Sequence, residues 1–221
     1  MTTEIVPLGD SALIVRVDDS LGAVVATMRK LEAANISGVS DIAPAFASVA
    51  LFLESPENLE AANEAIGVAL RKRRHLPRAA AKPRLVEVPV CYDVEFALDL
   101  ELVAQHCGLS PNDVVARHAA ARYDVRCVGF TPGFPFLGGL PAKLATPRRK
   151  SPRPAVPAGS VGIGGPQTGI YPLRSPGGWN IIGRTPLRLF DVTREPAALF
   201  RAGDRVHFFQ IGRDEFERWE K

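Results

Sequence analysis

The sequence predicts two structural units, a small α+β domain followed by a larger domain that is mainly β. Strand-like and helix-like patterns alternate over about the first 75 residues. A basic, proline-containing stretch follows at 71–84. Beyond Tyr123, short strand-like segments are separated by glycine and proline, which is typical of a β-barrel or sandwich. The expected boundaries are 1–78, a basic linker at 79–84, and 85–221.

The first domain is expected to run strand, helix, strand, strand, helix. The strand patterns lie at 11–17, around 39–43 and at 47–54. Ser20 is the expected N-cap of the first helix, and Ser55 caps the second, with Pro56 at its first position. The chain from Asn35 to Gly38 would end the first helix. The helix faces expected to point inward are Val24, Val25, Met28 and Leu31, then Leu59, Ala62, Ile66 and Leu70.

The second domain is expected to open with a strand at Leu85 and two short helices. Asp99 is the predicted cap of the first helix, which stops at Gly108. Ser110 caps the second, and Asp113 completes a capping box. The expected inward faces are Leu102, Val103 and His106, then Val114, Val115, His118 and Ala119. The clearest later strands are expected at 187–191 and 204–209.

Composition excludes several classes of protein. The 221 residues are 46% hydrophobic and 23% charged, which are ordinary globular values. A net charge of +3 does not by itself indicate nucleic-acid binding. No apolar run approaches the roughly 20 residues that cross a bilayer, and the start of the chain lacks signal-peptide features. Cys91, Cys107 and Cys127 form no Cys-x-x-Cys pair, so we expect reduced thiols in a cytoplasmic protein.

The basic stretch at 71–84 has two interpretations. It carries seven Lys and Arg residues, two prolines and no acid. A segment that binds phosphate or nucleic acid would have this composition. A solvated helix end that runs into an interdomain linker would have it too, because Lys and Arg are favourable near a helix C-terminus.

The most informative region runs from Gly129 to Pro186. Twelve of the 19 glycines and eleven of the 19 prolines lie there, which excludes long helices. Disordered sequence would not also be rich in aromatic residues. The region therefore indicates a rigid surface of loops and strands around a site. Its aromatic members are Phe130, Phe134, Phe136, Tyr171 and Trp179, and Phe134, Phe136 and Trp179 could equally be core.

Several catalytic signatures are absent from the sequence. It has no P-loop, and the segment from Gly162 to Gln167 does not fit a dinucleotide-binding motif. Ser160 lies in a near match to a nucleophile elbow, but Pro157 precedes it and glycines follow, so a turn or backbone-binding role is favoured. The four histidines show no metal-ligand spacing, and we predict no metal site.

Three polar residues are candidates for chemistry. His118 should point inward, either as a hydrogen-bonded core histidine or as a proton carrier at the base of a pocket. Gln167 offers a donor and an acceptor that match a substrate amide or carboxylate. Arg184 could bind a carboxylate or phosphate, or it could pair with an acid such as Asp191. Thr168 and Thr185 lie in the same stretch.

Several long segments follow the order found in a known family. They are Leu8–Leu13, Gly129–Pro141, Pro157–Gly162, Gln167–Pro172, Ser175–Trp179, Ile182–Pro186 and Gly203–Val206. Together they resemble the B subunit of bacterial 5-oxoprolinase, a family also called allophanate hydrolase subunit 1 or kinase inhibitor and described as the C and D subdomains of a carboxyltransferase. The resemblance covers essentially the whole chain.

The resemblance implies a small α+β domain followed by a mainly-β, cyclophilin-like barrel domain. It implies partners, subunits A and C, and ATP-driven opening of the lactam 5-oxoproline to glutamate. ATP would act at the level of the complex and not bind this chain alone, which would be inactive by itself. Members of the family also serve as the carboxyltransferase half of biotin-dependent urea carboxylases or as inhibitors of a sensor histidine kinase, so these two roles are the alternatives.

Within that resemblance, site roles fall on the residues already singled out. The expected catalytic residues are His118, Gln167 and Arg184. The expected substrate-binding residues are Phe130, Pro132, Gly133, Phe134, Phe136, Ser160, Thr168, Tyr171, Trp179 and Thr185. One segment departs from the family. Asp93 and Val94 stand where two glycines are usual, and Ala97 and Leu98 replace Gly-Pro, so we expect this loop to be rebuilt and Val94 to be strained if its φ is positive.

Overall fold

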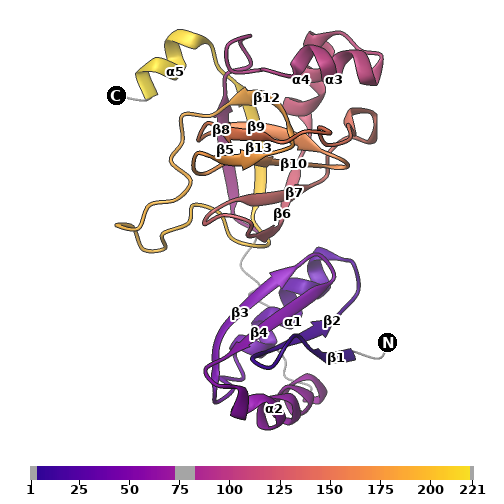
Figure 1. The fold of residues 1–221 in the computed structure, drawn as a ribbon, viewed down its shortest axis with the longest axis vertical. Coiled ribbons are helices and arrows are strands. Elements are labelled where there is room, and N and C mark those ends of the chain that lie inside the picture. Colours follow the sequence, from indigo (N-terminus) through magenta and orange to yellow (C-terminus); the bar gives the residue numbers. More distant parts are fainter. Residues whose placement is uncertain (1–3, 73–82, 220–221) are drawn as a thin grey trace. The chain divides into compact units, whose positions relative to one another are not determined.

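The computed structural model describes residues 4–72 and 83–219. The chain divides into two compact units, Met1–Lys82 and Pro83–Lys221 (Figure 1). Most of the predicted linker at 79–84, and of the basic stretch at 71–84, lies outside the described residues. The expected domain boundaries therefore stay predictions.

The first unit is one antiparallel sheet that packs against two helices (Figure 1). The helices are α1 (Leu21–Glu32) and α2 (Leu59–Arg71), and a 3-10 turn, η1 (Pro56–Asn58), precedes α2. The core contains Leu13, Leu51, Val24 and Ile66, so both helices cover the same sheet face. The strand order is β1 (Glu4–Pro7), β2 (Ala12–Arg16), β4 (Ser48–Leu53) and β3 (Val39–Ala45).

The predicted elements of this unit are confirmed, with one addition. Ser20 caps α1 by accepting a hydrogen bond from the Ala23 amide at 3.2 Å, and Ser55 caps the turn before α2. Val24 and Leu31 are buried as expected, whereas Val25 and Met28 are half-buried. Strand β1 was not predicted, because four residues that end in proline carry too little alternation to indicate a strand.

The second unit is built on a mixed seven-stranded sheet (Figure 1). Its order is β12 (Asn180–Arg184), β9 (Ser160–Gly164), β10 (Gln167–Ile170), β7 (Pro135–Gly138), β6 (Tyr123–Val128), β13 (Arg205–Gln210) and β5 (Leu85–Val90). The two end strands meet, because Cys91 and Arg184 exchange backbone hydrogen bonds of 2.8 and 2.9 Å. The sheet is therefore a nearly closed barrel.

Shorter elements surround the barrel. A two-stranded sheet pairs β11 (Ser175–Gly177) with β8 (Arg153–Val156). The helices are α3 (Leu100–Cys107), α4 (Pro111–Ala120), the 3-10 turn η2 (Ala142–Leu144) and α5 (Arg213–Trp219). Gly108 ends α3 in the left-handed region, and Ser110 with Asp113 forms the predicted capping box of α4. The finer assignment of this barrel as cyclophilin-like stays a prediction.

Two expectations for the helices were wrong. The Asp99 side chain makes no capping hydrogen bond, because its carboxylate is bound by two arginines and a strand amide. The buried face of α3 consists of Val103, Ala104 and Cys107, not Leu102 and His106, which are exposed. Small apolar residues, not the larger leucine, fit against the barrel here. Helix α5 was not predicted.

The strand expected at 187–191 is also absent from the described chain. Only Phe190 makes an isolated bridge there, with Ala198. Leu187 and Leu189 instead pack on the barrel core from an irregular segment. Their apolar pattern therefore reflects packing and not sheet pairing. By contrast, the strand predicted at 204–209 is confirmed as β13.

The hairpin at the end of the barrel predicts different costs for two glycines. Gly159 and Gly165 both have positive φ, +80° and +65°. A Cβ at Gly159 would collide with the carbonyl oxygen of Thr185, whereas none lies near Gly165. Gly165→Ala should therefore lose about 1–2 kcal/mol of unfolding free energy, and Gly159→Ala clearly more. Urea unfolding followed by tryptophan fluorescence measures both, and equal losses would contradict this packing.

Candidate functional site

Five of the predicted site residues form one aromatic pocket. Phe134 lies at its centre, with ring centroids 5.6 Å from Phe130, 4.8 Å from Phe136, 5.2 Å from Tyr171 and 5.5 Å from Trp179. These five side chains line a cavity of about 350 Å³. Such T-shaped and tilted contacts are the favoured arrangements of aromatic rings. The pocket therefore joins β7, β10 and the segment before β12 into one surface, which we call the aromatic pocket.

Glycine allows these rings to approach the backbone. A Cβ at Gly177 would fall on the Tyr171 ring, and one at Gly169 would lie 3.0 Å from two Phe134 ring carbons. Phe130, at the pocket's edge, has a φ of +67° and is 66% exposed. A bulky residue in the left-handed region is uncommon, and such conformations cluster at functional sites.

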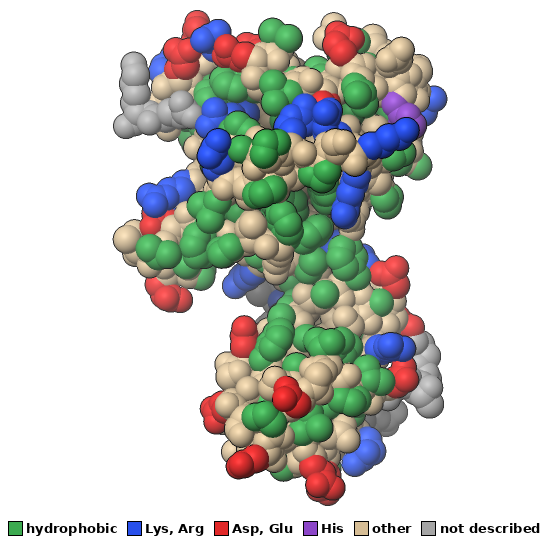
Figure 2. All heavy atoms as spheres, viewed as in Figure 1, with side chains coloured by type: hydrophobic (Ala, Val, Ile, Leu, Met, Phe, Trp, Pro, Cys, Tyr) green, Lys and Arg blue, Asp and Glu red, His purple; other side chains and the backbone are tan. Residues whose placement is uncertain are grey.

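A basic segment, residues 148–153, forms one wall of the aromatic pocket. The Arg148 guanidinium lies 5.7 Å from the centre of the Trp179 ring, a cation–π geometry. Arg149 also lines the pocket. Figure 2 shows Lys and Arg side chains among hydrophobic ones on the visible face of the second unit. The pocket thus combines flat apolar faces with positive charge.

Asp99 fixes this segment. Its carboxylate accepts hydrogen bonds of 2.8 Å from Arg149 and Arg153 and one of 2.7 Å from the Ile181 amide. The Asp99 side chain is only 3% exposed, so these bonds replace the water that a buried carboxylate would otherwise lose. Asp99 and the arginines were not among the predicted site residues. The signal that could have found them was four basic residues within 148–153, beside two prolines.

His118 lies in the barrel interior, fully buried. Its Nδ1 is 2.9 Å from the Tyr92 hydroxyl, and its Nε2 is 3.1 Å from the Thr168 hydroxyl. Thr168 donates its own proton to the Gly162 carbonyl at 3.0 Å, so it accepts from His118 Nε2–H. Tyr92 must then donate to Nδ1. This arrangement matches the core alternative, with hydroxyls as partners in place of a carbonyl.

Burial lowers the pKa of His118 from 6.5 to about 3. The imidazole is therefore neutral near pH 7. Burial also raises the pKa of the Tyr92 hydroxyl well above its usual value, so this partner keeps its proton. The two shifts have one cause, the loss of water around groups that would otherwise become charged.

Arg184 and Ser160 line a second cavity of about 410 Å³ in this unit, the Arg184 hollow. Arg184 Nε donates to the Ala158 carbonyl at 2.9 Å, and its guanidinium lies 5.8 Å from the ring centres of both Phe96 and Phe216. The expected alternative partner, Asp191, is 3.1 Å from Arg188. The hollow therefore presents an arginine held between two aromatic rings.

The structure does not bring the three candidate catalytic residues together. Gln167 pairs with Gly164 at one end of β9, and Arg184 pairs with Ser160 at the other. Four residues of strand separate these positions, about 13 Å. His118 lies inside the barrel between β10 and α4. Thr168 is bonded to His118, Thr185 is buried, and Pro132 with Gly133 forms the turn between β6 and β7. Their expected roles stay predictions.

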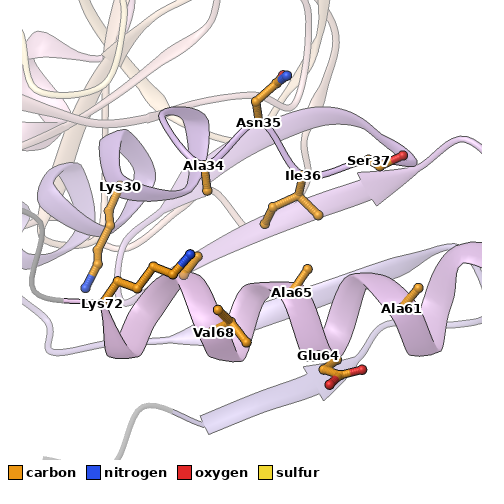
Figure 3. Close-up of a pocket in the computed structure, with 11 residues that line it drawn as sticks. Lys30, Ala34, Asn35, Ile36, Ser37, Ala61, Glu64, Ala65, Val68 and Lys72 are labelled. Atoms are coloured by element: carbon orange, nitrogen blue, oxygen red, sulfur yellow. The ribbon is translucent and has the colours of Figure 1, made fainter.

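A third cavity, of about 460 Å³, lies in the first unit between α2 and the segment after α1 (Figure 3). Ala61, Ala65 and Val68 line it from α2, and Lys30 and Lys72 lie at one end of it (Figure 3). It contains none of the predicted site residues. Among the described residues, no cluster of three or more His, Cys, Asp or Glu side chains could bind a metal. In that same part of the chain, none of the helices has the length and apolar character needed to cross a membrane.

Comparison with known proteins identifies the family. The model of the carboxyltransferase domain, subdomain C and D, matches residues 3–200. The chain belongs to this family. The 5-oxoprolinase B subunit of Bacillus subtilis (strain 168) is 40% identical over 99% of this chain and 97% of its own length. The 5-oxoprolinase B subunit of Escherichia coli O157:H7 is 47% identical over 79% of both chains. The predicted family is therefore confirmed.

Solved structures of carboxyltransferase-like proteins share the fold. TTHA0988 superposes with a TM-score of 0.77 at 36% identity over 90% of this chain, which spans 40% of that longer chain. PH0987 from Pyrococcus horikoshii gives a TM-score of 0.59 at 38% identity, covering 96% of this chain and 100% of its own. The K. lactis urea amidolyase, at 18% identity and a TM-score of 0.72 over 97% of this chain and 15% of its own, shows the fold alone.

The loop that departs from the family pattern is not strained. Its turn is closed by the amides of Phe96 and Ala97, which both donate to the Asp93 carbonyl, at 2.8 and 2.9 Å. The non-glycine residues with positive φ in the described chain are Asn35, Phe46 and Phe130, so Val94 avoids the left-handed region. Val94 is 88% exposed. This family member therefore forms the loop without the two glycines.

The lowered pKa of His118 predicts acid sensitivity. The unfolded chain binds a proton at His118 below pH 6.5 that the folded chain excludes until about pH 3. The stabilisation is complete above pH 6.5 and is lost as pH falls toward 3, by about 1.4 kcal/mol per pH unit. Urea unfolding at pH 7, 6 and 5 should show a steeper loss for the wild type than for His118→Gln. Parallel losses would show that His118 is not buried as a neutral imidazole.

Proposed function

We propose that this chain is the B subunit of a 5-oxoprolinase. In this proposal it acts with subunits A and C, and the complex opens 5-oxoproline to L-glutamate with ATP. The observation that supports the proposal most strongly is the 40% identity to the Bacillus subtilis B subunit, which extends over nearly the full length of both chains. End-to-end similarity favours a whole subunit of the same kind over a shared module.

The aromatic pocket is the proposed site of the lactam ring. A five-membered lactam is small and flat, and it can stack on Phe130 and Trp179 inside a cavity of about 350 Å³. The lactam of 5-oxoproline also carries a carboxylate, and Arg148 and Arg149 lie in the same wall. Apolar faces with a few placed charges are the usual design of a small-molecule site.

The separation of His118, Gln167 and Arg184 supports a centre that partner subunits complete. None of these three residues is among those that line the aromatic pocket in the described chain. His118 is neutral and enclosed, so it serves the barrel interior. We therefore propose that this chain is inactive alone and binds the substrate, while groups from subunits A or C supply the remaining chemistry. Gln167 and Arg184 stay candidates for contacts at that joint.

Reconstitution tests the function. Co-expression of this chain with candidate A and C subunits should give a complex that releases glutamate from 5-oxoproline only when ATP is present. Preparations that lack this chain, or contain it alone, should release none. A complex of A and C that is equally active without this chain would refute the assignment.

Phe130 tests the site within that complex. Because its side chain is 66% exposed, Phe130→Ala should fold normally yet raise KM for 5-oxoproline about tenfold, equivalent to about 1.4 kcal/mol of binding. Phe46 is a matched control, since it also has positive φ and is 37% exposed, but it lies in the first unit. Phe46→Ala should leave KM unchanged. If both variants behave like the wild type, the lactam does not bind in the aromatic pocket.

A further inference from the structure

A fourth cavity, of about 440 Å³, adjoins the aromatic pocket and is strongly basic. We call it the basic hollow. The polar residues that line it include Arg148, Arg149, Lys150, Ser151, His106 and Asn180. Arg148 and Arg149 line the aromatic pocket as well, so the two cavities share a wall.

The charge around the basic hollow is not balanced. Arg148, Arg149, Lys150 and Arg153 are four cations, and Asp99 is the carboxylate that the described structure places on them. Three positive charges are therefore left over. A single carboxylate would neutralise one of them, whereas a phosphoryl or polyphosphate group carries two or more. The excess charge favours a multivalent anion.

The basic segment is held in place before any ligand arrives. Asn180 donates to the Pro147 carbonyl at 2.9 Å, and the Arg149 amide donates to the Gly178 carbonyl at 2.7 Å. Asp99 fixes the guanidinium groups of Arg149 and Arg153. A site whose cations are already positioned loses little entropy on binding an anion. Ordinary surface lysines and arginines lack this support.

The Arg149 side chain also has an unused donor. Its Nε is buried and has no hydrogen-bond partner in the described structure. Buried donors are nearly always paired, so an orphan beside two cavities indicates a missing acceptor. A phosphate oxygen is a strong acceptor for guanidinium donors.

We propose that the basic hollow binds a phosphoryl group, beside the ring held in the aromatic pocket. The chemical class of the ligand is a polyphosphate, supplied either free or as the chain of a nucleoside triphosphate. The presence of the site does not rest on the proposed function. Its role does, because in a 5-oxoprolinase the shared wall would bring the phosphate of ATP next to the lactam.

Titration calorimetry of the purified chain tests the proposal. Trp219→Phe leaves Trp179 as the single tryptophan and provides the background for every variant. Inorganic triphosphate and ATP should bind, and Trp179 fluorescence should change as Arg148 leaves its ring. Lys150→Gln should weaken binding about tenfold, as should Arg148→Gln. Arg29→Gln removes the same charge from α1 of the first unit and should have no effect.

Other outcomes overturn the proposal. Absence of triphosphate binding at low salt would remove the site, and equal weakening by Arg29→Gln would show nonspecific attraction. Binding of 5-oxoproline but not triphosphate would make the basic segment a carboxylate clamp. If ATP binds and triphosphate does not, the nucleoside and not the phosphate is recognised. Because binding is measured on the isolated chain, these results are separate from the glutamate assay, which can fail while the phosphate site stands.

Discussion

The Asp99 carboxylate is the interaction on which the site depends. It lies just before α3 and accepts hydrogen bonds from Arg149, Arg153 and the β12 amide of Ile181. The Asp99 amide in turn donates to the Ile181 carbonyl at 2.7 Å. One residue thus connects α3, the barrel edge and the basic segment. Without it, two arginines would stand against the barrel with no counter-charge, and breaking a buried pair in this way costs about 3–5 kcal/mol.

Around this anchor, glycine and aromatic residues share the work of forming a surface. The rings of Phe134, Tyr171 and Trp179 can pack edge to face because Gly169 and Gly177 have no side chains in their way. The result is a rigid apolar cavity bordered by a rigid cationic segment. The neutral His118 contributes differently, since its bonds to Tyr92 and Thr168 link α4 to the barrel interior. The chain therefore resembles a binding scaffold more than a complete catalytic centre.

Local sequence signals predicted most of the fold and part of the site. Ser20, the Ser110–Asp113 box and Gly108 were identified because helix ends depend on hydrogen bonds within a few residues. The aromatic pocket was anticipated from glycine and proline density around its rings. Asp99 was misassigned because its partners are 50 or more residues away, at Arg149, Arg153 and Ile181. The separation of Gln167 from Arg184 depends on strand register, which spacing in the sequence does not reveal.

The central claim is that Asp99 organises the basic segment to bind an anion, and one affinity tests it directly. The measurement is the dissociation constant of triphosphate for Asp99→Asn, made at a temperature where fluorescence shows the variant to be folded. By Coulomb attraction alone, removing a negative charge from a cationic site should tighten anion binding. If Asp99 positions the arginines, binding should instead weaken, by about tenfold or more. Tighter binding in Asp99→Asn would contradict this account.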